Sequence, residues 1–412
     1  MQLIVVIGGG AAGLMAAVTA AENGAAVTVL ERNEKLGKKL YITGKGRCNC
    51  TNVCPADEFR QNVVRNPRFL FSALEALPPE ALLAKLESWG CPTVVERGNR
   101  AFPASQKASD VTRAFERRLQ QLGVTVRKNA RAAAIVTEAG QVRGVRLENG
   151  ETLAADAVIV CTGGVSYPST GSTGDGYRLL AACGHTLLPP KPALIPLTSD
   201  ADWVKELQGL SLKNVRLMLT HGKKKLFSDL GEMLFTHFGI SGPLALSASS
   251  YLAGLPVAEC AVTLDLKPGL TETQLDARIL RDIATDGKKS LQNLLRGLYP
   301  ERLAATMAEL AGIDPRKPAL ELRREEREAL VRLTKALPVP VNGAEPIAAA
   351  VVTAGGADVK QFSPSTLESK LVQGLYAAGE VLDVDALTGG FNLHIAFSTG
   401  YLAGRAAAQA DS

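Results

Sequence analysis

The first thirty residues alternate between short apolar runs and a glycine-rich turn. Leu3 to Ile7 is an unbroken apolar run, which is typical of a strand buried on both faces of a parallel sheet. Ala11 to Asn23 is an alanine-rich helix closed by Gly24, and Ala25 to Leu30 is a second apolar run. The pattern predicts a β-α-β unit at the N-terminus.

The turn in this unit has the spacing G-x-G-x-x-G. Gly8 allows a tight turn, Gly10 allows the backbone to approach a pyrophosphate, and Gly13 allows helix and strand to pack closely. The phosphates would lie on free N–H groups at the helix N-terminus. Glu31, at the end of the second run, would accept hydrogen bonds from ribose hydroxyls. Together these features predict a site for the ADP half of a dinucleotide.

The following residues alternate between helical and β patterns. Helices are expected over Arg68 to Leu77, Pro79 to Trp89 and Ala108 to Leu122, the last with Ser109 or Asp110 as its cap. Strands are expected over Val124 to Arg127, Ala133 to Thr137, Val142 to Leu147 and Ala157 to Val160, with a tight turn at Asn149-Gly150. The last strand runs into a second glycine turn, Cys161 to Gly164.

The middle of the chain changes character after the proline cluster at residues 189–192. Short alternating strands are expected from residue 193 to 266, with an exposed hairpin turn at Lys223 to Lys225. Thr271 to Leu337 has a helical pattern. We therefore expect three segments: residues 1–190, an inserted β and helical region at 191–340, and residues 341–412.

The C-terminal segment repeats the strand, glycine and helix order. Gly374 to Ala378 is a strand, Gly379-Glu380 ends it, and Asp383 follows. Gly389 to Asn392 then begins a helix that continues to Ala408. This order predicts that the C-terminus completes the nucleotide-binding domain that the N-terminus begins. Two contiguous domains are the alternative.

Composition and charge limit the class of protein. The 412 residues carry a net charge of +5, a mild excess that favours anionic ligands without indicating nucleic acid. Leu3 to Ala21 is uncharged and of membrane-span length, but no basic segment precedes it and glycines interrupt it, so a soluble cytoplasmic protein is expected. The seven cysteines include Cys48, Cys50 and Cys54, whose spacing fits neither a zinc site nor a redox C-x-x-C pair.

Two glycine and helix units at opposite ends of the chain favour FAD as a non-covalently bound dinucleotide. Asp383 can bond ribityl or phosphate-linked hydroxyls. The helix start from Gly389 to His394 can direct N–H groups at the flavin N1 and C2 carbonyl. The loop from Gly44 to Asn49, with the lysines before it, can wrap the phosphates. No second G-x-G-x-x-G is present in the sequence, so NAD(P)H would bind only transiently.

Five motifs carry a resemblance to a known family: GGGAAG, KLGKKLYITGKGRCNCTN, TGGVSYPSTGSTGDGY, FTHFGISGP and GGFNLHIAFSTG. Over nearly the whole chain the sequence resembles the bacterial BaiN-type flavoproteins, which include proteins described as aminoacetone-oxidase-like. More distantly, TGG followed by TGDG is similar to the fumarate reductase flavoproteins. The resemblance implies an α/β fold, a glutathione-reductase-like FAD-binding Rossmann domain with an inserted β-barrel and helical region.

Motifs and resemblance together give a set of candidate cofactor contacts. The positions expected to contact FAD are Gly8, Gly10, Ala11, Ala12, Gly13, Glu31, Arg32, Lys38, Lys39, Gly46, Arg47, Cys48, Asn49, Ala133, Thr162, Gly163, Gly379, Glu380, Asp383, Gly390, Asn392, Leu393 and His394. No metal site is expected.

Three residues are candidates for catalysis. His237 lies in a loop shaped by Gly239 and Gly242 and can donate a proton, or it is a hydrogen-bonded structural histidine. Tyr167 can protonate an enolate or simply pack, and Arg100 can orient an anionic substrate or lie on the surface.

The predicted function is that of an FAD-dependent oxidoreductase. The bile-acid-processing members of the resembled family imply NAD(P)H-linked reduction of an activated C=C bond in a small organic substrate. An oxygen-using amine oxidase is the alternative enzyme. A flavoprotein acting on nucleic acid and a flavin-binding regulator are the other classes, and the former is disfavoured because basic patches interleaved with aromatics are missing from the sequence. We expect a small-molecule substrate, no nucleic acid and no membrane as partners.

Overall fold

The computed structural model describes residues 1–252 and 254–410. The chain divides into unit 1, residues 1–193 with 346–412, and unit 2, residues 194–345. Unit 1 is thus built from both ends of the sequence. The expected boundaries, after residues 190 and 340, lie a few residues earlier than these. The first differs because the proline cluster belongs to strand β12 (Leu187–Ala193), which pairs with β20 (Val352–Ala357) inside unit 1.

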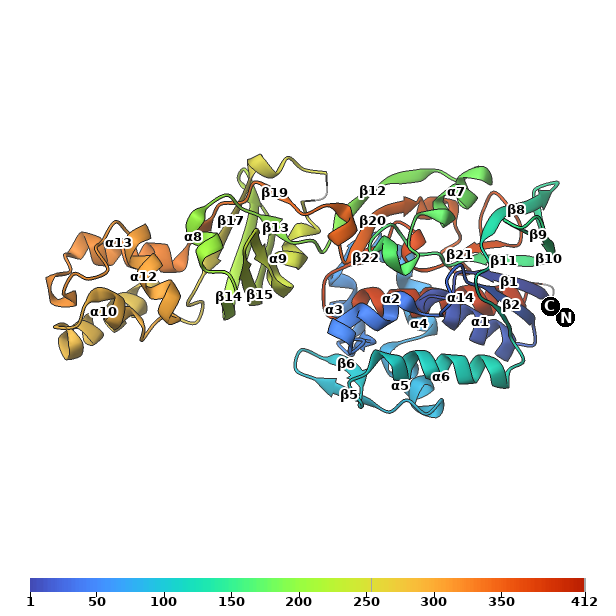
Figure 1. The fold of residues 1–412 in the computed structure, drawn as a ribbon, viewed down its shortest axis with the longest axis horizontal. Coiled ribbons are helices and arrows are strands. Elements are labelled where there is room, and N and C mark those ends of the chain that lie inside the picture. Colours follow the sequence, from blue (N-terminus) through green and yellow to red (C-terminus); the bar gives the residue numbers. More distant parts are fainter. Residues whose placement is uncertain (253, 411–412) are drawn as a thin grey trace. The chain divides into compact units, whose positions relative to one another are not determined.

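A five-stranded parallel sheet forms the centre of unit 1 (Figure 1). Its order is β21-β11-β1-β2-β7, and every neighbouring pair is parallel. The strands are β1 (Leu3–Ile7), β2 (Ala26–Leu30), β7 (Thr125–Arg127), β11 (Ala157–Val160) and β21 (Leu375–Ala377). All of β11 and all but the first residue of β1 are buried, as expected for strands covered on both faces. The C-terminal strand therefore joins the same sheet as the N-terminal β-α-β unit.

Two helices from opposite ends of the chain cross closely in unit 1. They are α1 (Ala11–Glu22) and α14 (Phe391–Ala408). A Cβ atom added at Gly400 would lie 2.2 Å from the carbonyl oxygen of Ala12, and one at Gly404 would lie 2.3 Å from that of Ala16. The absence of side chains at these two glycines therefore allows the helix backbones to touch.

Smaller elements surround this centre. The additional sheets are formed by β8 (Ala132–Glu138), β9 (Gln141–Leu147) and β10 (Thr152–Ala154), by β3 (Thr51–Asn52), β5 (Thr93–Glu96) and β6 (Arg100–Pro103), and by β4 (Val63–Arg65) with β22 (Asp385–Ala386). The remaining α-helices of unit 1 are α2 (Lys38–Ile42), α3 (Ala56–Gln61), α4 (Phe71–Ala76), α5 (Pro79–Ser88), α6 (Ala108–Gln121) and α7 (Asp175–Ala182).

Two local expectations about helices need correction. The cap of α6 is Lys107, whose extended backbone precedes the helix, so Ser109 and Asp110 lie inside its first turn. Asp110 still suits this place, because a carboxylate near a helix N-terminus is favoured by the helix dipole. The expected helix from Arg68 begins as a short 3-10 turn, Pro67–Leu70, before α4.

Unit 2 holds a seven-stranded antiparallel sheet of order β18-β17-β14-β15-β16-β13-β19. The strands are β13 (Leu197–Thr198), β14 (Ser211–His221), β15 (Lys224–Thr236), β16 (Gly239–Ser241), β17 (Cys260–Asp265), β18 (Leu337–Val339) and β19 (Gly343–Ala344). Gly222 and Lys223 form the turn between β14 and β15, so the predicted lysine-rich hairpin is confirmed.

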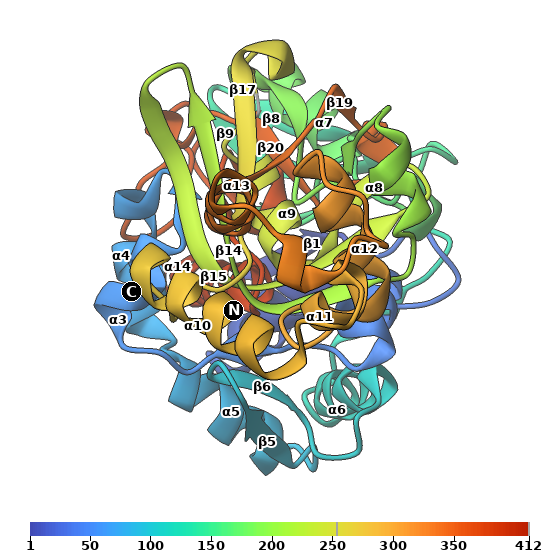
Figure 2. The same ribbon diagram turned by 90° about the vertical axis from the view of Figure 1, so that its left-hand side faces the viewer.

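The helical pattern after residue 271 is also confirmed. The helices of unit 2 are α8 (Asp202–Glu206), α9 (Gly242–Ser249), α10 (Glu272–Asp286), α11 (Leu291–Leu295), α12 (Glu301–Leu310) and α13 (Arg324–Lys335). Figure 2 shows α10 to α13 grouped together. Within the described residues, none of the helices combines the length and the apolar character that a bilayer span requires.

Candidate functional site

The loops that follow four parallel strands meet at one edge of the unit 1 sheet. They are Gly8 to Gly10 after β1, Glu31 after β2, Cys161 to Gly164 after β11, and Gly379-Glu380 after β21. The carboxyl ends of parallel strands share an edge, which is where open α/β sheets bind ligands. All the expected cofactor contacts belong to unit 1.

The three fingerprint glycines have different surroundings. Gly8 has a φ of 106°, and a Cβ there would lie 2.5 Å from the carbonyl oxygen of Cys161. A Cβ at Gly13 would lie 1.8 Å from the carbonyl oxygen of Gly8, whereas one at Gly10 would meet no protein atom within 4 Å. Gly8 and Gly13 are therefore required by the protein's own packing, and Gly10 leaves open space.

That open space lies at the N-terminus of α1. Ala11 and Ala12 belong to its first turn, which contains no acidic residue, and Gly10 provides no side-chain cap. The first N–H groups of a helix have no partner within the helix and carry partial positive charge. This end of α1 therefore suits a phosphate group.

Glu31 connects the glycine turn to the end of β2. Its side chain is buried, one carboxylate oxygen accepts the Gly9 amide at 2.8 Å, and the other accepts the Asn33 amide at 2.8 Å. The oxygen that binds the Asn33 amide also accepts the Asn33 side chain at 2.8 Å, so the oxygen that binds Gly9 is the one that can accept a further hydrogen bond from a hydroxyl.

Arg32 takes part in an ion-pair cluster at the start of α7. It lies 3.0 Å from Asp175, which Arg131 also contacts at 2.6 Å. The hydrogen bonds from Arg131, with a smaller effect from the charge of Arg32, hold the pKa of Asp175 below its usual value. Asp175 is the first residue of α7, and Gly174 is the cap.

Lys38 and Lys39 differ in their surroundings. Lys38 lies near the surface and pairs with Glu34 at 3.3 Å. The Lys39 ammonium donates to Glu380 at 2.6 Å and to the Ser166 hydroxyl at 2.7 Å. The other Glu380 oxygen accepts the Thr353 amide at 2.7 Å. This network connects α2 with the loops after β11 and β21.

The loop before β3 has an unusual backbone. Gly44, Lys45, Gly46 and Cys48 all have positive φ, and two of these are not glycine. Strained conformations of this kind are held in place by their surroundings and are frequent at functional sites. Arg47 pairs with Glu96 and lies 4.0 Å over the Phe102 ring.

Asn49 connects this loop to the start of α14. Its side-chain oxygen is buried and has no hydrogen-bond partner among the described residues. Gly390, the cap of α14, lies so near that a Cβ there would be 2.9 Å from this oxygen. A buried acceptor without a donor fits a bound group that carries N–H or O–H.

The first turn of α14 contains the three expected contacts that come last in the sequence. Asn392 accepts the Ala386 amide at 2.9 Å and donates to the Ala386 carbonyl at 2.7 Å, which fixes the segment before the helix. Leu393 is partly buried. The His394 side chain is fully enclosed, so the structure places it in the core of unit 1.

His394 has an apolar setting. Its Nδ1 lies 3.0 Å from the Thr51 hydroxyl, and the Phe59 ring contacts it edge-on. Burial lowers the pKa of His394 to about 4, so the ring is neutral at pH 7. Its amide donates to Gly390 within the helix. Its Nε2 is buried and has no hydrogen-bond partner among the described residues, so the expected contact of His394 with the cofactor stays a prediction.

Two aspartates follow Glu380. Asp383 accepts the Gly355 amide at 3.0 Å and the Asn66 side chain at 3.0 Å, so both of its oxygens bind protein groups. Asp385 is buried against Arg65 at 2.6 Å. Burial raises the pKa of Asp385 to about 6, although Arg65 opposes the shift. Sequence reasoning missed Asp385, and its position two residues after Asp383 was the available signal.

The remaining expected contacts lie near β11 and in β8. The Thr162 hydroxyl is buried and has no partner among the described residues, and Gly163 has a φ of 72°. The Ala133 carbonyl accepts a hydrogen bond from Arg178 at 2.7 Å. Ala133 is therefore attached to α7 through Arg178.

The three catalytic candidates are divided between the units. Tyr167 follows Ser166 in unit 1 and has a φ of 49°. Arg100 begins β6, also in unit 1, and its Nε donates to the Arg97 carbonyl at 3.1 Å. His237 is exposed in unit 2, in the turn between β15 and β16.

Comparison with known proteins gives matches over nearly the whole chain. The family model "HI0933-like protein Rossmann domain" matches residues 2–406. The chain is 34% identical to 3-dehydro-bile acid delta(4,6)-reductase of Clostridium scindens, over 99% of this chain and all of that protein. It is 29% and 31% identical to the ribosomal RNA dihydrouridine synthases of Escherichia coli and Haemophilus influenzae, over 96% of each chain.

Solved structures with low sequence identity share the fold. The 3-ketosteroid delta1-dehydrogenase of Sterolibacterium denitrificans matches with a TM-score of 0.54 and 14% identity, over all of both chains. A quinol-fumarate reductase matches with a TM-score of 0.52 and 18% identity, over 99% of this chain and 72% of that one.

A fumarate reductase flavoprotein subunit of Mycobacterium tuberculosis is 32% identical over 45% of this chain and 37% of its own length.

These findings confirm the prediction of a flavoprotein. They do not support the prediction that nucleic acid is excluded as a partner. Nucleic acid was expected not to be a partner, but two relatives are named as ribosomal RNA enzymes, so that exclusion is not supported. The glycine turn, the uncapped start of α1 and the buried acceptor of Asn49 fit a bound dinucleotide. The chain belongs to the HI0933-like family and is an FAD-dependent oxidoreductase.

Proposed function

We propose that the protein reduces a C=C bond conjugated to a carbonyl, with NAD(P)H as the electron donor. The observation that carries this proposal is the near-complete match to the delta(4,6)-reductase of Clostridium scindens. The dihydrouridine synthases point to the same chemistry, because dihydrouridine is uridine with two hydrogens added across the C5=C6 bond beside a carbonyl. The substrate differs between these relatives, but the reaction class is shared.

Unit 1 is proposed to hold FAD along the carboxyl edge of its sheet. The start of α1 would bind the phosphates and Glu31 the ribose, while Asn49 and the start of α14 would contact the other end. FAD, when bound, supplies acceptance and donation of a hydride. The parallel sheet and the separate antiparallel unit support the finer proposal of a glutathione-reductase-like domain with an inserted barrel and helical region.

The ribose contact can be tested with two glutamates from one loop. Glu31→Ala removes a buried acceptor, whereas Glu34→Ala changes a mostly exposed side chain and serves as the control. Hydrogen bonds to charged groups contribute about 1.5–3 kcal/mol, so Glu31→Ala should weaken FAD binding by roughly tenfold to a hundredfold. Titration of apoprotein with FAD, followed by flavin fluorescence, measures this. Equal affinities for the two variants would reject the ribose role.

Tyr167 is the proton donor that we propose for the carbon left anionic by hydride addition. Its left-handed backbone follows directly on Ser166, which is held by Lys39 and Glu380. This network would fix the direction of the tyrosine side chain. Arg100 is retained as a candidate for orienting an anionic substrate, and His237 as the alternative donor.

The two half-reactions separate these roles. Mixed anaerobically with NADH or NADPH, the wild-type flavin should bleach, and a conjugated enone should then restore its colour. Tyr167→Phe should slow the second step at least tenfold and leave the first unchanged, because only the second needs the proton. His237→Ala is the comparison. If His237→Ala slows the second step and Tyr167→Phe does not, His237 is the proton donor in place of Tyr167. Failure of both nucleotides to bleach the flavin would favour the amine oxidase alternative.

A ribosomal RNA uracil is the second candidate substrate, favoured by the two relatives that match 96% of this chain. Mass spectrometry of ribosomal RNA from cells with and without the gene measures dihydrouridine directly. Loss of one dihydrouridine on deletion, restored by wild type but not by Glu31→Ala, would assign this substrate. Unchanged dihydrouridine, together with enone turnover by the purified protein, would assign a small molecule.

A further inference from the structure

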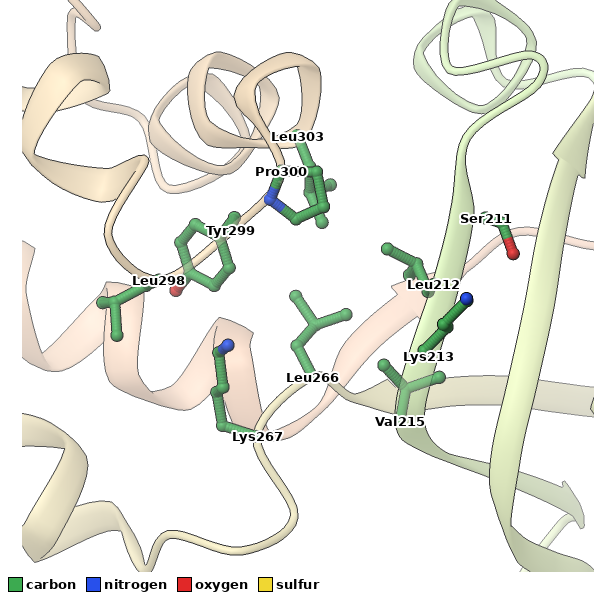
Figure 3. A pocket seen from close by; sticks show the side chains of 10 residues that line it. All are labelled: Ser211, Leu212, Lys213, Val215, Leu266, Lys267, Leu298, Tyr299, Pro300 and Leu303. Atoms are coloured by element: carbon green, nitrogen blue, oxygen red, sulfur yellow. The ribbon is translucent and has the colours of Figure 1, made fainter. Parts of the chain in front are cut away.

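Unit 2 contains a cavity of about 260 Å³ between its sheet and its helices (Figure 3). One wall is the first part of β14, and the other is the segment from the end of α11 to the first turn of α12. Apolar side chains supply most of the lining. They are Leu212, Val215, Leu266, Leu298 and Leu303.

The charged groups of the lining are all positive. Lys213 and Lys267 border the cavity, and none of its lining residues is Asp or Glu. Lys213 is exposed, whereas Lys267 is half-buried. Burial, and to a lesser degree the charge of Arg278, lowers the pKa of Lys267. An anion placed beside this ammonium would offset both unfavourable effects.

The acid closest in sequence is already occupied. Asp265 lies 2.6 Å from the Lys335 ammonium and accepts the Lys267 amide at 2.9 Å. Arg278 pairs with Asp282 at 2.9 Å. No ion pair of the Lys267 ammonium occurs within the described part of the chain. A half-buried cation beside an apolar cavity is unfavourable unless a counter-ion joins it.

Tyr299 gives the cavity a fixed wall. The side chain is buried, and its hydroxyl lies 2.5 Å from that of Thr334, which in turn donates to the Leu330 carbonyl. The tyrosine hydroxyl is therefore used inside the helical group. Figure 3 shows the Lys267 side chain directed toward Tyr299, with Leu266 between the two walls.

We propose that this cavity binds an organic anion that carries an apolar tail. The Lys267 ammonium would pair with the anionic end, Lys213 on the opposite wall would add a weaker attraction, and the leucines would cover the tail. This site lies entirely in unit 2 and does not depend on the flavin reaction. Cavities for drug-sized ligands span about 300–1,000 Å³, so this smaller one suits a short-chain carboxylate.

Octanoate is the test ligand for this cavity. 1-Octanol, which has the same chain length and no charge, is the control ligand. Calorimetric titration of the FAD-loaded full chain should give saturable octanoate binding at one site, with 1-octanol at least tenfold weaker. Lys267→Met keeps most of the side-chain stem and removes the charge, so octanoate binding should weaken by tenfold or more. Lys213→Met should weaken it less, because Lys213 is exposed.

Lys225→Met is the control, since this lysine is exposed in β15 and does not line the cavity. It should leave octanoate affinity unchanged. The 1-octanol affinity should be the same in the wild type and Lys267→Met, which shows that the cavity has kept its shape. Equal octanoate binding by wild type, Lys213→Met and Lys267→Met, or no binding to wild type, would overturn the proposal. Lys213→Met keeps the test valid if Lys267→Met fails to fold.

Discussion

Gly10 and Gly13 stand three residues apart in one turn, yet they face different constraints. Gly10 adjoins open space at the start of α1, whereas Gly13 touches the backbone of Gly8. We expect Gly10→Ala to leave the stability of the apoprotein nearly unchanged and to weaken FAD binding, because a methyl group would enter the proposed phosphate position. Urea unfolding and FAD titration measure the two effects separately.

Gly13→Ala is the matched comparison. Its methyl group would lie 1.8 Å from a carbonyl oxygen, so we expect a loss of about 1–3 kcal/mol in the free energy of unfolding. The interpretation of Gly10 fails if Gly10→Ala binds FAD as tightly as the wild type.

The buried His394 gives the protein a pH-dependent contribution to stability. Its pKa falls from 6.5 to about 4 on folding, so the unfolded chain binds the proton more readily. The stabilisation is complete above pH 6.5 and is lost as the pH falls toward 4. Between pH 7 and pH 5 we expect the free energy of unfolding of the wild type to fall by about 2 kcal/mol through this group. The His394→Gln variant should not show this decrease.

Urea unfolding of both proteins at the two pH values isolates this effect. Asp385 has a raised pKa and an opposite slope, with stability lost as the pH rises from 3.8 to about 6, but it is present in both proteins and cancels. His221→Gln is the control, because His221 lies at the surface beside Glu259. Equal pH dependence in wild type and His394→Gln would contradict the assignment.

The sequence predicted the role of a residue correctly where neighbouring residues determine that role. It did not predict contacts between residues that lie far apart in the sequence. Gly8 permits a tight turn, Gly13 permits a close backbone contact, and Gly10 leaves space for a ligand. All three roles depend on residues within one short stretch of sequence. The network of Lys39, Ser166 and Glu380 joins positions more than 300 residues apart, so no local pattern contains it. The enclosure of His394 depends on Phe59 and Thr51, which lie far from it in sequence.

At the scale of elements, the crossing of α1 and α14 is the critical contact. Alanine normally favours a helix over glycine by about 1 kcal/mol. At Gly400 we expect the reverse, because the added methyl group would lie 2.2 Å from the Ala12 carbonyl and would force the helices apart. Gly400→Ala should lower the melting temperature and weaken FAD binding, since α14 carries one end of the proposed site.

Gly269→Ala serves as the control for that substitution. Gly269 has no neighbour within 4 Å of a Cβ and no positive φ, so its change should shift the melting temperature little. A melting temperature for Gly400→Ala equal to or above that of the wild type would show that the crossing is not tightly packed.

The elements themselves were predictable to different degrees. β1, β11 and α14 follow from apolar runs and glycine signals, and their bounds agree closely with the structure. The cap of α6 was wrong because Lys107 takes the capping position through its backbone, without a side-chain hydrogen bond. The proline cluster was taken as the end of the first segment, but it belongs to β12, which pairs with β20 inside unit 1 despite its three prolines.

At the scale of the whole molecule, unit 1 has its own hydrophobic core, formed entirely by residues outside 194–345. Ala193 pairs with Val352, so the chain leaves unit 1 and returns at neighbouring strands. We expect a protein in which a short glycine-serine linker replaces residues 194–345 to bind FAD and show a flavin spectrum. It should lack octanoate binding. A colourless, unfolded product would show that unit 1 depends on unit 2.

The pairing of the two chain ends sets an order of events on the ribosome. Synthesis at about 5 to 20 residues per second separates β1 from α14 by roughly 20 to 80 s, and β21 and α14 emerge after the other strands of the parallel sheet. Until then β11 is an open sheet edge and α1 lacks its partner helix. In the site proposed here, flavin loading must therefore wait until α14 has been made. A ribosome that stops before residue 391 leaves a product that contains the entire glycine fingerprint and still cannot keep its cofactor.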